Sequence, residues 1–184
     1  MEGLTFEACL KDAQRLGYAE ADPTFAAEGF DTAHKLAILT SLAFGTKIDA
    51  EAIHVEGISA ITPLDLKMAD DLGYRIKLLG VAERTKTGIE QRVHPTMVPK
   101  SSPIAQVMGV LNAVSVDADA VREITLVGPG AGGNATASAV LGDITDIAKT
   151  RPGTQQVPVL GRPAHLLEPY RQAQMRSHEG GYFI

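Results

Sequence analysis

The sequence has no tryptophan and a single cysteine, and aromatic residues make up only 5% of its 184 positions. Cys9 has no second cysteine with which to form an internal disulfide, so a reducing, cytoplasmic compartment is favoured. No run approaches the roughly 18 consecutive apolar residues that a membrane-spanning helix needs. We therefore expect no membrane partner.

Basic residues are also sparse, because 17 Lys and Arg stand against 22 Asp and Glu and give a formal net charge of -5. Without a basic run, we expect no nucleic-acid partner. None of the 5 histidines is spaced from another as metal ligands are, so we predict no metal site. No G-x-S-x-G motif is present, and nucleophilic serine chemistry has no support.

The 45% hydrophobic content is enough for one well-packed domain. Apolar periodicity and capping residues predict helices over residues 4–17, 30–44, 63–72 and 135–148, with a short one over 166–175. Alternation predicts strands over 52–57, 74–84, 88–93, 110–116 and 122–127. Tight turns between neighbouring strands make most pairs antiparallel. We predict an α+β fold with one mixed, mainly antiparallel sheet and helices packed on one face.

The helix over 30–44 has its polar residues at its start and is apolar nearly all round after them, which is typical of a buried helix. Asp31 and Lys35 are four residues apart and therefore lie on one face. One interpretation is an ordinary ion pair that stabilises the helix by a few tenths of a kcal/mol. The other is a lysine close to a buried environment, tuned to exchange a proton with a substrate oxygen. Spacing leaves both open.

A glycine-rich segment, Gly128-Pro129-Gly130-Ala131-Gly132-Gly133, contains the pattern G-x-G-x-x-G between a strand and a helix. This pattern is typical of dinucleotide binding. The residues after its helix are too few to complete a Rossmann sheet. Two interpretations remain open: a tight strand-to-helix turn, or a loop that contributes amides to a cofactor site held mainly by another domain.

Two segments, Gly17-Tyr-Ala-Glu-Ala-Asp-Pro-Thr24 and Glu28-Gly-Phe-Asp-Thr-Ala-His-Lys-Leu36, resemble the signature of homoserine dehydrogenases. Further matches are Ile61-Thr-Pro63, Gly73-Tyr-Arg-Ile-Lys-Leu-Leu-Gly80, His94-Pro-Thr96 and the glycine-rich segment with Thr136-Ala-Ser-Ala-Val140. The resemblance runs in order over about residues 3–149, so it is more specific than any one motif.

The resemblance implies an NAD(P)-dependent oxidoreductase that interconverts L-homoserine and L-aspartate 4-semialdehyde, a step toward threonine, methionine and isoleucine. It implies that Lys35 is the catalytic residue and that Glu20 and Asp31 bind the substrate. It also implies that Gly130, Gly132 and Gly133 contact the NAD(P) cofactor.

The resemblance further implies a division of the chain at residue 149. Residues 1–149 resemble the catalytic domain, which binds substrate and mediates dimerisation, and 150–184 resemble a linker and the start of a truncated C-terminal regulatory domain. In this family a Rossmann domain holds most of the NAD(P), so we expect these residues to be inactive without one and to form a homodimer or higher homo-oligomer. The alternative is a non-enzymatic module for dimerisation or amino-acid binding.

Overall fold

The computed structural model describes residues 6–16, 27–150 and 162–173. Its elements are, in chain order, α1 (Phe6–Arg15), α3 (Phe30–Phe44), β1 (His54–Val55), α4 (Pro63–Asp71), β2 (Tyr74–Arg84), β3 (Ile89–Pro99), the 3-10 turn η1 (Pro103–Gln106), β4 (Leu111–Ala118), β5 (Arg122–Pro129), α5 (Gly133–Lys149) and the 3-10 turn η2 (Ala164–Leu166). The predicted α+β class is confirmed.

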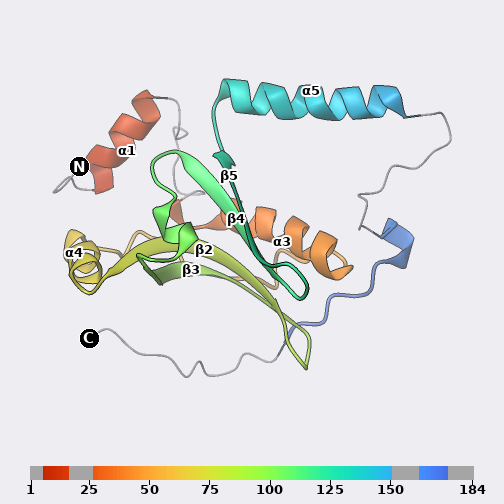
Figure 1. Cartoon of the computed structure of the whole chain (residues 1–184), viewed down its shortest axis with the longest axis horizontal. Coiled ribbons are helices and arrows are strands. Elements are labelled where there is room, and N and C mark those ends of the chain that lie inside the picture. Colours follow the sequence, from red (N-terminus) through yellow and green to blue (C-terminus); the bar gives the residue numbers. More distant parts are fainter. Residues whose placement is uncertain (1–5, 17–26, 151–161, 174–184) are drawn as a thin grey trace.

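The strands form two sheets rather than the single sheet expected. In the first, the order is β1-β3-β2, with β2 antiparallel to β3 and β1 parallel to β3. The second is the antiparallel hairpin of β4 and β5. Between β3 and β4 the chain passes through η1 and then Gly109, whose φ is 67°. This turn carries the hairpin out of the plane of the first sheet (Figure 1).

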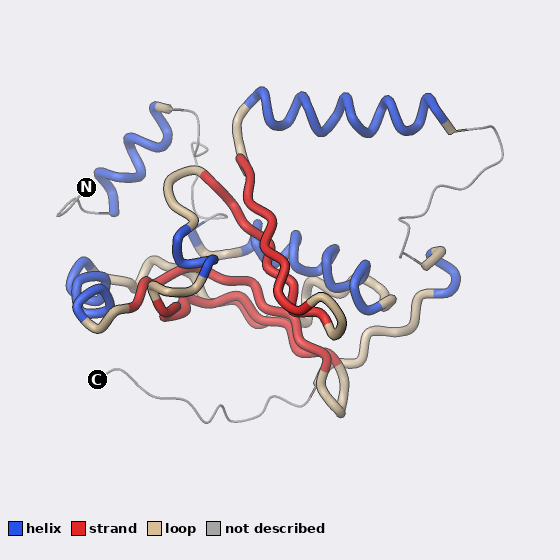
Figure 2. The backbone as a smooth tube through the Cα atoms, in the orientation of Figure 1, coloured by secondary structure: helices blue, strands red, loops and turns tan. Residues whose placement is uncertain are grey.

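The core lies between α3 and the first sheet. Ala33, Leu36 and Ala37 of α3 pack with Ile53 and with Val93, which is 0% exposed. The small alanine side chains let the helix approach the strands closely. Figure 2 shows α3 running along the sheet on one side, as predicted.

The helix α3 has the predicted bounds, yet it is not buried all round. Ile38, Leu39 and Leu42 are exposed, although the periodicity predicts a buried helix. Only the face with Ala33, Leu36 and their neighbours meets the sheet. In the described part of the chain, α3 therefore presents an apolar outer surface.

The last described segment, residues 162–173, is here called the strap. The helix predicted over 166–175 is wrong in its described part: only η2 is helical, and beyond it Gln172 pairs in parallel with Ile89. Residues 174–175 lie outside the described residues. Glu168 N–H donates to Gly45 O at 3.1 Å, and Ile89 N–H donates to Arg171 O at 2.9 Å. These backbone bonds to distant segments favour an extended strap over a helix.

The helix α4 begins with a reciprocal capping box. Asp65 N–H donates to Thr62 Oγ1 at 3.2 Å, and Thr62 N–H donates to Asp65 Oδ2 at 2.8 Å. The hydrogen bond from the Thr62 side chain, and then that from its backbone, lower the pKa of Asp65. Thr62 is thus the N-cap, and Pro63 stands at the first helical position, where its missing N–H costs nothing.

Thr62→Ala is expected to lower the free energy of unfolding by about 1 kcal/mol at neutral pH. Folding lowers the pKa of Asp65. The ionised carboxylate therefore stabilises the folded state above the ordinary pKa of about 3.9, and this stabilisation is lost as the pH falls below that value. Urea unfolding at pH 7 and pH 3 should show the Thr62→Ala difference shrinking in acid. The control is Asp143→Asn, which removes the charge of an exposed carboxylate on α5. A difference that is equal at both pH values would contradict this account.

Candidate active site

The start of α3 is fixed by a glycine in the left-handed conformation. Gly29, the N-cap, has φ 86° and is buried. A Cβ at this position would lie 3.0 Å from Val93 Cγ1. The two residues before Gly29 are held by the loop after β1: Ile58 N–H donates to Ala27 O at 2.9 Å, and Ser59 Oγ donates to the Glu28 carboxylate. The first turn of α3 is therefore anchored at a defined place against β1 and β3.

The structure brings Asp31 and Lys35 together on that first part of α3. Lys35 Nζ donates to Asp31 Oδ2 at 2.7 Å. The two side chains are 62% (Lys35) and 48% (Asp31) exposed. Asp31, at the helix start, also lies where a negative charge interacts favourably with the helix dipole. The pairing expected from the spacing is present, but the burial expected around Lys35 is absent from the described structure.

The Asp31–Lys35 stripe continues along α3 with Ile38 and Leu42. These positions follow at helical spacing and are 50% and 43% exposed. We call Asp31, Lys35, Ile38 and Leu42 the outer face of α3. A charged pair followed by exposed apolar side chains is typical of a surface that another region covers.

Glu20, the other predicted substrate ligand, lies outside the described residues. Its role stays a prediction.

The three predicted cofactor-binding glycines differ in their surroundings. A Cβ on Gly130 would overlap the Asn112 side-chain amide, which fills that space. Gly132 has φ 109° and caps α5, and nothing lies within 4 Å of a Cβ added there or at Gly133. Gly130 is thus compatible with the tight-turn interpretation, whereas Gly132 and Gly133 leave room for a ligand beside the first turn of α5.

Within the described ranges, no hydrogen bond or ion pair joins this glycine loop to the Asp31–Lys35 pair. The loop leads into α5, of which no residue is buried. Val140, Ile144 and Ile147, at helical spacing, are 51%, 55% and 70% exposed. The helix α5, like the outer face of α3, therefore offers an apolar surface.

Lys77, which no sequence motif marks as a site residue, is partly buried, as one of the two interpretations has Lys35. Burial, and secondarily the charge of Arg75, lower the pKa of Lys77. Lys77 Nζ donates to Val107 O, and Arg75 Nη1 donates to Ala105 O at 3.3 Å. Residues two apart on a strand share a face, which is the only sequence signal that these two cations act together. They attach the η1 segment to β2.

Among the residues that the structure describes, no group of three or more His, Cys, Asp or Glu side chains is arranged to hold a metal ion. In the same part of the chain, no helix is both long and apolar enough to cross a bilayer. Cys9, in α1, is exposed.

A family model of homoserine dehydrogenase matches residues 1–145. The chain is 55% identical over 148 residues to the homoserine dehydrogenase of Neisseria gonorrhoeae, covering 80% of this chain and 34% of that protein. It is 47% identical over 185 residues to that of Pseudomonas aeruginosa, covering 100% of this chain and 43% of that protein.

Solved structures give the same result. A homoserine dehydrogenase from Thiobacillus denitrificans matches with a TM-score of 0.76 and 53% identity, covering 80% of this chain and 34% of that one. A hyperthermophilic archaeal homoserine dehydrogenase in complex with NADPH matches with a TM-score of 0.61 and 29% identity, covering 84% of this chain and 43% of that one. The chain thus spans 34% to 43% of the length of these relatives. With residues 1–145 matched by the family model, the chain belongs to the homoserine dehydrogenase family.

Proposed function

We propose that this chain forms the substrate side of an NAD(P)-dependent homoserine dehydrogenase, which interconverts L-homoserine and L-aspartate 4-semialdehyde on the way to threonine, methionine and isoleucine. The observation that carries the proposal is the Asp31–Lys35 pair at 2.7 Å on the exposed first turns of α3. Homoserine has an ammonium group near one end and a hydroxyl at the other, so a carboxylate can bind the first while an amine serves the second.

Lys35 is the proposed proton-transfer residue. In the oxidation direction, its neutral amine accepts the proton of the substrate hydroxyl while hydride leaves the carbon that bears this hydroxyl. When bound, the nicotinamide ring supplies the hydride acceptor. In reduction, the Lys35 ammonium returns the proton to the aldehyde oxygen. Covering the outer face of α3 would exclude water from around this group.

Asp31 and Glu20 are the proposed ligands of the substrate ammonium group. A carboxylate accepts charge-assisted hydrogen bonds from an ammonium group, and these bonds are stronger than neutral ones. Among the described residues only Oδ2 of Asp31 has a partner, Lys35, so a carboxylate's second oxygen is there to accept such a bond. The same carboxylate therefore orients both the lysine and the substrate.

The glycine loop is the proposed contact with the cofactor. Gly132 and Gly133 have open space where a side chain would stand, and no side chain caps the first amides of α5. A planar ring or an anionic group can approach such backbone closely. Gly130 contributes by letting the loop pass Asn112. The NADPH complex of the archaeal relative supports a nicotinamide cofactor for the whole enzyme.

The exposed apolar surfaces support the proposed assembly. The outer face of α3 and the apolar side of α5 would be covered by a cofactor-holding Rossmann domain, for which the relatives' greater length leaves room. Residues 1–149 would be the catalytic unit, and 150–184 the linker and the start of a regulatory domain.

The hairpin supplies a surface for a second copy. Val114 pairs with Leu126 and Val116 with Ile124, and all four side chains are exposed. Because alternate residues share a face, they form one apolar side, while Ser115 and Thr125 bond to each other on the opposite one. We propose that this apolar side forms the homodimer contact.

Titrating L-homoserine into the chain by calorimetry tests the substrate role. Asp31→Asn is expected to weaken binding about tenfold or more, because a hydrogen bond to a charged group is worth roughly 1.5–3 kcal/mol. The matched control is Asp71→Asn, which removes the acid of another exposed i,i+4 pair, Lys67–Asp71. Equal weakening in both variants would contradict the role of Asp31. No binding by any form would favour the non-enzymatic assembly module.

A further inference from the structure

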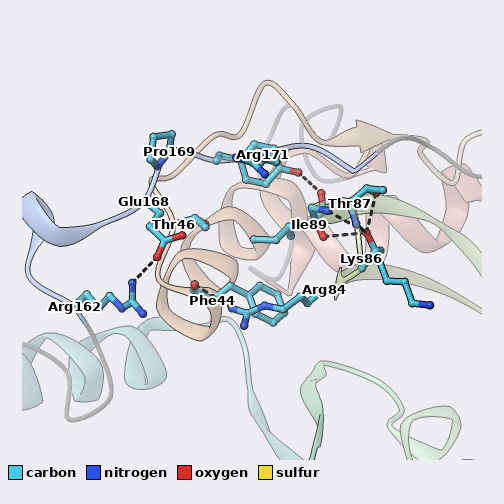
Figure 3. A pocket seen from close by; sticks show the side chains of 13 residues that line it. Phe44, Thr46, Arg84, Lys86, Thr87, Ile89, Arg162, Glu168, Pro169 and Arg171 are labelled. Atoms are coloured by element: carbon cyan, nitrogen blue, oxygen red, sulfur yellow. Dashed lines mark hydrogen bonds and ion pairs between the residues drawn. The ribbon is translucent and has the colours of Figure 1, made fainter.

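A cavity of about 550 Å³ lies at the other end of α3 from Lys35. Three segments far apart in the sequence form its walls: the end of α3 with Thr46, the β2–β3 turn, and the strap (Figure 3). We call it the strap cavity. Its volume lies within the range of about 300–1,000 Å³ that is typical of small-molecule sites. Phe44 lies nine positions after Lys35, so about 13.5 Å of helix separates the cavity from the proposed active site.

Positive charge dominates the lining. Arg84, Lys86, Arg162 and Arg171 stand against the single carboxylate of Glu168. Arg162 Nη1 pairs with that carboxylate at 3.0 Å. Arg171 and Lys86 are exposed, and neither side chain has an ion pair in the described structure. The cavity therefore has a surplus of cations.

The negative end of the α3 dipole does not cancel this surplus, because an arginine covers it. Arg84 Nη2 donates to Phe44 O at 3.2 Å, and its guanidinium lies 5.0 Å from the centre of the Phe44 ring. Contact with a carbonyl at the helix end is favourable for a cation. Arg84 is thereby held in place at the wall of the cavity.

A buried hydroxyl in the same wall lacks a partner. Thr46 is 6% exposed, and its Oγ1 makes no hydrogen bond in the described structure. Its backbone is fixed, since Ser41 Oγ donates to Thr46 O at 2.6 Å and Thr46 pairs with Glu168. The hydroxyl oxygen itself is shielded from solvent, so Thr46 belongs to the fixed wall behind the cavity rather than to its open surface.

Backbone hydrogen bonds fix the strap to the β2–β3 turn and to Lys47. Ile89 N–H donates to Arg171 O at 2.9 Å, and Lys47 N–H donates to Glu168 O at 2.8 Å. A Cβ on Gly88 would overlap the Arg171 carbonyl oxygen, so only glycine permits this approach. The backbone bonds and the glycine place Arg171 beside the turn that carries Lys86.

We propose that the strap cavity binds a small anion that carries phosphate or carboxylate groups. Arg84 and Arg171 supply the positive charge at the wall of the cavity. Lys86 extends outward from the turn in Figure 3, and its flexible stem lets the ammonium swing over the bound anion. The site is separate from the proposed dehydrogenase chemistry and does not depend on it.

Calorimetric titration of the chain with inorganic pyrophosphate and, separately, with citrate tests the proposal at an ionic strength held constant with sodium chloride. We expect saturable 1:1 binding of at least one probe, and the preferred probe distinguishes phosphate from carboxylate chemistry. Arg171→Gln and Lys86→Gln should each weaken it about five- to tenfold. Lys149→Gln, an exposed cation at the end of α5, is the control and should leave the affinity unchanged.

Thr46→Val changes the wall behind the cations without changing any charge. The variant should bind the probe with unchanged affinity, and its melting temperature without ligand should not fall, because valine removes an unpaired buried hydroxyl. Absence of saturable binding by both probes would overturn the proposal. So would equal weakening by Lys149→Gln, which would indicate general charge screening.

Discussion

Lys35→Met is expected to lower kcat for homoserine oxidation by about 100- to 10,000-fold, the range typical of a lost general acid–base group. Methionine keeps the unbranched stem and removes the amine. Lys67→Met is the matched control, because both lysines are exposed and pair with an aspartate four residues away, at 2.7 Å and 3.0 Å. Loss of such a pair changes helix stability by only about 0.3–0.5 kcal/mol.

The assay uses this chain joined to the remaining part of the Pseudomonas aeruginosa relative, since the chain spans 43% of that protein. Turnover is followed by the absorbance of the reduced nicotinamide. The chain alone should show none. Retention of full activity in Lys35→Met, or an equal loss in Lys67→Met, would rule out Lys35 as the proton-transfer residue.

Gly29→Ala is expected to lower the free energy of unfolding by about 3 kcal/mol. Two effects add: a left-handed conformation costs a residue with a Cβ roughly 1–2 kcal/mol, and crowding a packed core costs about 1–3 kcal/mol. The second applies because the new methyl group would lie 3.0 Å from Val93 Cγ1, in the best-buried part of the core.

Gly73→Ala isolates the first effect. Gly73 has the same φ of 86°, but nothing lies within 4 Å of a Cβ added there. Its expected cost is therefore about 1–2 kcal/mol. Denaturant unfolding of both variants, compared at unchanged m-values, measures the difference. Equal destabilisation would mean that the Gly29 site relaxes around the added methyl group.

Local signals predict the helices well where a specific residue ends them. Gly45, with φ 71°, stops α3 at Phe44, and the Thr62 capping box starts α4 at Pro63. Signals that depend on distant partners are weaker. The strand expected over 52–57 shrinks to His54–Val55, because only these two residues pair in register with β3, and Glu56 adds one further backbone bond to Val93 O at 2.8 Å. Beyond η2 the strap is extended because its backbone bonds to Gly45, Lys47 and Ile89.

The candidate site likewise has features that local spacing predicts and features that depend on distant parts of the chain. Spacing alone predicts the Asp31–Lys35 contact, because residues four apart on a helix are neighbours. Spacing does not predict how exposed that contact is, since exposure depends on whatever covers the outer face of α3. The strap cavity has no local signal at all: Thr46, Arg84 and Arg171 meet only through the fold.

Asn112 and Gly130 are linked by the space that they share. The amide of Asn112 stands where a side chain at position 130 would have to be, so neither position can change freely. In related chains, a larger residue at 130 should occur together with a smaller one at 112. The two positions then vary as a coupled pair, and the cost of either single change would be relieved by the other. Gly130 of the glycine-rich segment is therefore required by the packing of Asn112 in β4.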